Sequence, residues 1–277
     1  MIRSLISLSF ATALMAGAAQ AQTLRVVETE SDKFEAVASL PTGQSADITL
    51  SFDEASGLSP QSLGVSVSAL NPFDPAFLSR LPAGAPGVIG LAAGLPLLIT
   101  VSPEAGFSFD GVAEVELYTK DLHFTVGSPL RMFKAEEGGE FRDITVRNAS
   151  GSYRSLGSTG KFSEFVIVTD LRSPDVVLAS KAARLDGLIA DARAVAGDAL
   201  ADALEGDLAV LRAAAADDRF GDAIDAADAI ADRADDAGEA GFLPDTYTPG
   251  GPDNLSGQIR AEAETIRFTL TLAANGL

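Results

Sequence analysis

The chain has no cysteine, no tryptophan and a single histidine in 277 residues. Without cysteine, neither disulfide bonds nor thiol chemistry nor a zinc–thiolate site can contribute to the folded protein. Without tryptophan, and with only three tyrosines, a platform for stacking sugars is poorly supplied. The fold must therefore rest on its apolar core, for which 47% hydrophobic residues are sufficient at this length.

Positive charge is also scarce, because 20 Lys and Arg stand against 39 Asp and Glu. Both halves are acidic: residues 22–172 carry 11 basic and 19 acidic residues, and residues 173–277 carry 8 and 20. Such a surface repels nucleic acid and anionic lipid headgroups, so we expect neither as a partner. We interpret the acidity as a surface that keeps the protein soluble.

The first 21 residues have the pattern of a cleavable secretory signal peptide. Arg3 supplies a positive charge, Leu5 to Gly17 form a short apolar run, and Ala19-Gln20-Ala21 is a small-x-small cleavage pattern. The run is too short to span a bilayer comfortably. We therefore expect export to the periplasm or the exterior, and a mature chain that begins at Gln22 and has no integral membrane span.

Composition changes abruptly near residue 173. Residues 22–172 are rich in Val, Phe, Ser, Thr and Gly, whereas the chain from 173 onward is dominated by Ala, Asp, Leu and Arg. These are the residue preferences of strands and of helices, respectively. We predict an α+β protein with two segregated domains: an immunoglobulin-like β-sandwich over 22–172 and an antiparallel helical bundle over 173–277.

Alternation of apolar and polar residues marks the strands of the first domain. The clearest run is 46–52, where four apolar residues alternate with three polar ones. Similar runs predict strands at 65–69, 97–101, 112–118, 122–126 and 162–167. Several short strands separated by turn residues are typical of an immunoglobulin-like sandwich.

Two segments depart from this alternation. Asp74-Pro75 predicts one short helix that ends near Leu81 and plugs one end of the sandwich. Residues 81–103 have no charge but are broken by Pro and Gly, which predicts an apolar loop packed over the sandwich rather than a membrane span. A flat exposed patch around 82–95 would instead indicate a protein partner.

Four helices are predicted after residue 173. Ser173-Pro174-Asp175 begins the first, with serine as the cap, and Gly197 ends it. We expect Asp198 to cap the second, the third to begin near Phe220, and the fourth to cover 255–270. The Gly- and Pro-rich loop 238–254 is expected to be exposed. Short turns between helices favour a small antiparallel bundle.

Part of the helical region resembles the FIMAH-type module found at the C-terminal ends of extracellular bacterial proteins. The stretch Leu204 to Ile230 has Leu208 and Leu211 in a Leu-x-x-Leu pair, followed by Phe220 after an acidic turn. An aromatic residue that often follows the position of Ile230 in that module is absent here. The module has no established catalytic role, so this resemblance implies none.

The whole chain resembles an uncharacterised family of exported bacterial proteins that pair such a sandwich with a helical tail. Four runs carry the resemblance: Asn71-Pro72-Phe73-Asp74-Pro75, Pro129-Leu130-Arg131-Met132-Phe133, Phe141-Arg142-Asp143-Ile144-Thr145 and Phe162-Ser163-Glu164-Phe165. The resemblance spans most of the mature chain. The resemblance implies no activity.

The single histidine does not indicate a catalytic triad. Alternation places Leu122 and Phe124 inward and His123 outward, and no serine or carboxylate lies at a recognisable spacing. We expect an ordinary surface histidine.

Two further motifs lack the residue that their chemistry needs. Gly157-Ser158-Thr159-Gly160-Lys161 is similar to a phosphate loop, but Ser155 replaces its first glycine and Phe162 its final hydroxyl residue, so we predict a turn between strands. Lys161-Phe162-Ser163 resembles the His-Phe-Ser motif of self-cleaving β-sandwich domains. Lysine replaces the histidine that would act as the general base, so we expect no cleavage.

Acidic pairs occur at Glu136-Glu137, Asp217-Asp218 and Asp235-Asp236. Calcium is the ion that such oxygen ligands prefer. No segment matches the calcium-loop pattern, however, and the acids of 222–232 repeat on the helix face away from the apolar stripe. We expect solvated acids, with calcium as the one cofactor that the composition allows.

We assign no catalytic or cofactor-binding residue. The export signal and the missing catalytic patterns favour a non-enzymatic envelope or extracellular protein, a binding or adhesion module for an unidentified protein or envelope component. The alternative is a secreted hydrolase that uses two carboxylates about 5 to 10 Å apart. An aromatic-lined cleft with adjacent acids would favour the enzyme.

Overall fold

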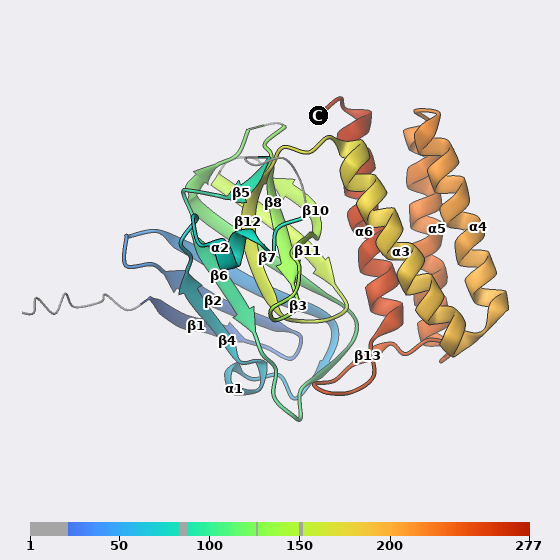
Figure 1. The fold of residues 1–277 in the computed structure, drawn as a ribbon. Coiled ribbons are helices and arrows are strands. Elements are labelled where there is room, and N and C mark those ends of the chain that lie inside the picture. Colours follow the sequence, from blue (N-terminus) through green and yellow to red (C-terminus); the bar gives the residue numbers. More distant parts are fainter. Residues whose placement is uncertain (1–21, 83–87, 126, 150–151) are drawn as a thin grey trace, which may run out of the picture.

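The computed structural model describes residues 22–82, 88–125, 127–149 and 152–277. Two antiparallel sheets are followed by a helical C-terminal region, which confirms the α+β class (Figure 1). The predicted signal peptide, residues 1–21, lies outside the described residues. Within them, no helix combines the length and the apolar character that crossing a membrane requires.

The larger sheet, sheet A, has the strand order β1-β2-β3-β7-β11-β10. Its strands are β1 (Thr23–Thr29), β2 (Lys33–Ser39), β3 (Ser45–Ser56), β7 (Ser108–His123), β10 (Thr145–Ala149) and β11 (Ser152–Thr159). The two strands predicted at 112–118 and 122–126 were wrong as separate elements, because β7 continues to His123. The Thr119 hydroxyl donates to the Ser45 carbonyl at 2.6 Å and fastens β7 to the start of β3 beyond the predicted break. Val126 lies outside the described residues.

The smaller sheet, sheet B, has the order β4-β6-β12-β8-β9, with β5 also paired to β12. Its strands are β4 (Val65–Ala69), β5 (Ile89–Leu91), β6 (Leu97–Val101), β8 (Leu130–Ala135), β9 (Arg142–Asp143) and β12 (Glu164–Asp170). The predicted strands at 65–69 and 97–101 are confirmed. The predicted loop at 81–103, of which residues 83–87 lie outside the described residues, was wrong in part, because β5 forms within it. The burial of Ala92 and Leu95 in the core agrees with the predicted packing over the sheets.

The two sheets share one hydrophobic core, to which β2, β3 and β7 contribute from sheet A and β6 and β12 from sheet B. A second cluster lies on the opposite face of sheet B, where Phe77 packs with Phe133 and Phe141. Phe77 belongs to α2 (Pro75–Leu78), so the predicted short helix covers this outer face instead of plugging an end. An unpredicted turn of helix, α1 (Pro60–Leu63), precedes β4.

The helices of the C-terminal region are α3 (Pro174–Ala196), α4 (Asp198–Ala216), α5 (Phe220–Glu239) and α6 (Leu255–Ala274). Each packs against its neighbour in the chain, and α6 also packs against α3, which closes the bundle (Figure 1). Ser173 is the N-cap residue of α3, as predicted, although its side chain makes no capping hydrogen bond. The predicted cap of α4 was wrong: Gly197 is its N-cap, so that Asp198 is the first helical residue and pairs with Arg193 at 2.7 Å.

The N-terminus of α6 is fastened to sheet A. The preceding loop, predicted to be exposed, forms strand β13 (Thr246–Tyr247) against β7. The buried side chain of Asn254 accepts from Gly257 N–H at 2.8 Å and donates to the Gly111 carbonyl at 2.7 Å. A Cβ at Gly257 would lie 2.0 Å from that carbonyl oxygen, so only glycine allows this approach. The contact fixes one wall of the pocket described next.

Candidate ligand-binding pocket

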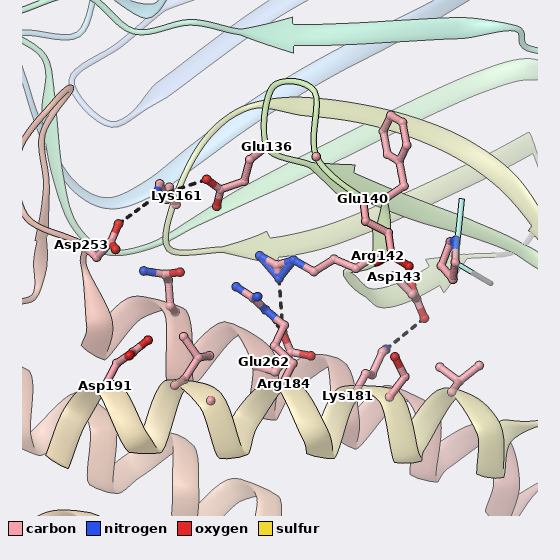
Figure 2. A pocket seen from close by; sticks show the side chains of 18 of the residues that line it. Glu136, Glu140, Arg142, Asp143, Lys161, Lys181, Arg184, Asp191, Asp253 and Glu262 are labelled. Atoms are coloured by element: carbon pink, nitrogen blue, oxygen red, sulfur yellow. Dashed lines mark hydrogen bonds and ion pairs between the residues drawn. The ribbon is translucent and has the colours of Figure 1, made fainter. Parts of the chain in front are cut away.

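A pocket of about 530 Å³ lies where the strands meet the helices. Its walls are the β8–β9 connection, β9, the first part of α6 and one face of α3 (Figure 2). This volume falls in the range of small-molecule sites. Most of the side chains that project into it are charged, which is unusual for a cavity between packed elements.

A buried ion pair joins β9 to α3 at one end of the pocket. Lys181 Nζ lies 3.0 Å from Asp143 Oδ2, and both side chains are almost fully buried, at 4% and 3% exposed. Lys181 also donates to the Thr265 carbonyl at 2.9 Å and to Thr269 Oγ1 at 3.0 Å, both on α6. One ammonium group therefore holds β9, α3 and α6 together.

The partners of Asp143 decide its protonation. Burial by itself raises the pKa of Asp143, but Lys181 and the hydrogen bond from Thr145 N–H at 2.9 Å outweigh burial and lower it. The carboxylate is therefore ionised at neutral pH, and the pair is a true ion pair rather than a neutral hydrogen bond.

A second buried carboxylate, Glu262 of α6, lies between two arginines. Its Oε2 atom is 3.4 Å from Arg142 Nη1 and 3.2 Å from Arg184 Nε (Figure 2). Glu262 is 4% exposed, whereas the two arginine side chains are 25% and 34% exposed toward the pocket. Burial, and then Arg184, lower the pKa of Arg142, against the opposite effect of Glu262. Positive charge is thus concentrated on this wall.

Acidic residues stand at the rim of the pocket. Lys161 Nζ pairs with Asp253 at 2.8 Å and with Glu136 at 3.3 Å. Glu140 and Asp191, both exposed, complete the acidic rim.

Lys161 belongs to the turn that was predicted at 157–161. This prediction was wrong in part, because residues up to Thr159 belong to β11 and only the last two form the turn.

Lys134 of β8 lies between the two sheets, behind the pocket wall that carries Arg142. It is fully buried, and its Nζ donates to Thr159 Oγ1 at 2.9 Å. Among the described residues, no carboxylate lies within ion-pair distance of it. Burial, and then the nearby Arg142, lower its pKa well below the usual value. The amine is therefore a costly group in the core.

The residues that the sequence singled out lie elsewhere or play other parts. His123 is exposed at the end of β7, as predicted. Of the acidic pairs, Glu136 lies at the pocket rim, Asp217 pairs with Arg219, and Asp235 pairs with Arg260. Over the described ranges, no group of three or more His, Asp or Glu side chains is placed to hold a metal ion.

No sequence pattern singled out the residues at the centre of the pocket, although Lys181 and Glu262 each occupy a position that is unusual for a charged residue. Lys181 occurs on the buried stripe of α3, four residues before Leu185 and eight before Ile189. Glu262 likewise falls on the buried face of α6. A charged residue at such a position requires a buried partner, but the periodicity does not say which.

One protein family covers the strands and the helices together. Residues 9–274 match the model of the Family of unknown function (DUF6689). The chain belongs to this family. A comparison with curated proteins and one with solved structures each found no match. The DUF6689 match includes β9 and α3, so the whole pocket lies within the family region.

Proposed function

We propose that this DUF6689 member is an exported, non-enzymatic binding protein whose ligand site is the pocket between sheets and helices. The observation that carries the proposal is the pocket itself, because its charged walls are held by buried contacts before any ligand arrives. A preformed site binds a ligand without the free-energy cost of ordering its side chains and loops. The alternative site, a patch around 82–95 for a protein partner, has less support, because residues 89–91 form β5 and Ala92 and Leu95 are buried in the core.

The proposal includes export, which the signal-like pattern of the first 21 residues supports. Expression with that segment in a Gram-negative host, followed by N-terminal sequencing of the periplasmic and medium fractions, tests it. A mature protein that starts at Gln22 supports export. An uncleaved cytoplasmic chain contradicts it. The immunoglobulin-like type of the paired sheets and the FIMAH-type nature of the bundle are likewise proposals, which comparison with an experimental structure tests.

Filling the pocket is expected to abolish ligand binding. Gly187 is an exposed residue of α3 that lines the pocket, and a Cβ there would meet no atom within 4 Å. The Cβ of Gly187→Phe therefore enters open space, and we expect its ring to cover part of the cavity. A ligand at about 100 times its Kd stabilises the native state by about 2.7 kcal/mol. We expect thermal shifts with sugars, amino acids, carboxylates or phosphates that vanish in this variant.

Gly206→Phe is the matched control, because Gly206 is also an exposed mid-helix glycine whose Cβ would meet nothing within 4 Å. It lies on α4, away from the pocket. Shifts that persist in Gly206→Phe but vanish in Gly187→Phe locate the ligand in the pocket. Shifts that persist in both variants, or no shift with any compound, would count against the proposal.

The secreted hydrolase remains the second candidate. A groove of about 580 Å³ crosses the outer face of sheet A, and Glu114 and Glu116 of β7 both line it. Glu116 accepts a hydrogen bond from Arg154 at 2.7 Å. Hydrolysis of a glycoside that is lost in Glu114→Gln and kept in Gly187→Phe would establish this function in place of binding.

A further inference from the structure

The charges around Glu262 do not balance. Arg142 and Arg184 approach the same oxygen of this one buried carboxylate, at 3.4 and 3.2 Å. Two guanidinium groups are always charged at physiological pH, so Glu262 can neutralise only one of them. The other acids near them, such as Glu136, stand at the pocket rim and not at this contact. In a chain with a net charge of −19, such a local surplus is unexpected.

The hydrogen bonds of the two arginines are also incomplete. Arg184 Nε is buried and makes no hydrogen bond within the described part of the chain, despite its closeness to Glu262. Arg142 makes only the one to Glu262 there. A guanidinium group has five N–H donors, and buried donors are nearly always paired. The other donors of the two arginines are not buried, and both side chains line the pocket shown in Figure 2, so these donors are accessible to a ligand there.

We propose that the pocket binds a small ligand through an anionic group, a carboxylate or a phosphate, held between Arg142 and Arg184. The inference rests on the proposed function of the pocket and names the chemistry of its ligand. A planar guanidinium matches either anion with two parallel hydrogen bonds. The acidic rim formed by Glu140 and Asp191 disfavours polyanions, so the rest of the ligand is neutral or cationic.

Titration with two probe anions tests the proposal. Inorganic phosphate and acetate are added separately to residues 22–277, and the ¹⁵N–¹H resonances of the arginine Nε groups are followed. We expect a saturable shift of the Arg184 resonance with at least one anion. Arg184→Gln should weaken the apparent affinity about 10-fold or more, because a charge-assisted bidentate contact is lost.

Arg193 is the control, since it lies further along α3 outside the pocket and its guanidinium already pairs with Asp198, Asp202 and Glu205. Its resonance should not respond, and Arg193→Gln should leave the anion affinity unchanged. A purely structural role for Arg184 predicts that Arg184→Gln lowers stability but changes no anion titration. That result would overturn the inference.

The outcomes separate this inference from the proposed function. A response to phosphate alone indicates a phosphorylated ligand, one to acetate alone indicates a carboxylate, and a response to both supports the shared anion chemistry. Neutral compounds whose binding is lost in Gly187→Phe and kept in Arg184→Gln would overturn the anion inference while the pocket stands. No response to either anion, with no compound sensitive to Gly187→Phe, would overturn both.

Discussion

Lys181→Met is expected to lower the free energy of unfolding by about 3–5 kcal/mol, because it strands the ionised Asp143 in a buried site. The two groups lie 3.0 Å apart and neither side chain is more than 4% exposed, so the carboxylate would lose its charged partner at a site with little solvent exposure. The same change removes the hydrogen bonds to Thr265 and Thr269 of α6. Urea unfolding followed by circular dichroism measures the loss.

A double variant separates the charge effect from lost packing. Lys181→Met with Asp143→Leu replaces both charges by apolar groups and should recover most of the stability, because well-packed apolar residues substitute well for a buried ion pair. If the double variant is as unstable as Lys181→Met alone, packing rather than the stranded carboxylate is responsible.

The Lys181–Asp143 ion pair should also make the free energy of unfolding depend on pH in the acidic range. The folded-state pKa of Asp143 is lowered, so its contribution to stability is present above the unfolded aspartate pKa of about 3.9. This contribution is lost as the pH falls through the lower folded-state pKa. The stability difference between the wild type and Asp143→Asn should therefore shrink below about pH 4. A difference that stays constant into strong acid would contradict the assignment.

Lys134→Met is expected to stabilise the protein by about 1–3 kcal/mol at neutral pH, because it removes a buried amine that has no carboxylate partner in the described part of the chain. Methionine has a similar length and fits a buried position. Thr159 does not lose all its hydrogen bonds, since its hydroxyl still donates to the Lys161 carbonyl at 2.7 Å.

The stability gained by Lys134→Met should decrease as the pH rises. Burial lowers the pKa of Lys134 in the folded state, so the unfolded chain binds its proton more tightly over the range between the folded value and about 10.4. The wild type therefore gains stability as the pH rises through that range, and the advantage of Lys134→Met should shrink toward pH 10. Unfolding in urea at neutral and alkaline pH measures both proteins.

Lys120→Met is the control, because Lys120 is an exposed residue of β7 and should change stability by no more than about 0.5 kcal/mol at any pH. A destabilised Lys134→Met variant would show that the amine contributes favourably to the core. An advantage that is the same at pH 7 and pH 10 would contradict the lowered pKa of Lys134.

The arrangement also explains why the pocket can be preformed. Lys181 fastens α3 to β9, and Asn254 fastens the start of α6 to the carbonyl of Gly111. These contacts fix the helices on which Arg184 and Glu262 stand. The arginines are therefore held near each other by interactions that do not involve them.

The sequence by itself determined the fold class and some of the local elements, although it predicted no strand at β1, β2, β8, β10 or β11. Alternation at 46–52 predicted β3, and Ser173-Pro174 and Gly197 marked the ends of α3, because strand faces and helix ends depend on residues close together in the chain. Even there, local signals misplaced details, since β5 and β13 pair with the ends of the central strands β12 and β7, beyond the points where β6 and β11 stop.

Only the tertiary structure decided the pocket. Arg142 meets Glu262 across 120 residues, and Lys181 meets Asp143 although one lies on a helix and the other on a strand. Periodicity shows that a charge is buried, but the identity of its partner depends on how sheets and helices pack. Lys134 illustrates the same limit: an apolar strand containing one lysine does not reveal whether its amine reaches water, and here the opposite sheet covers it.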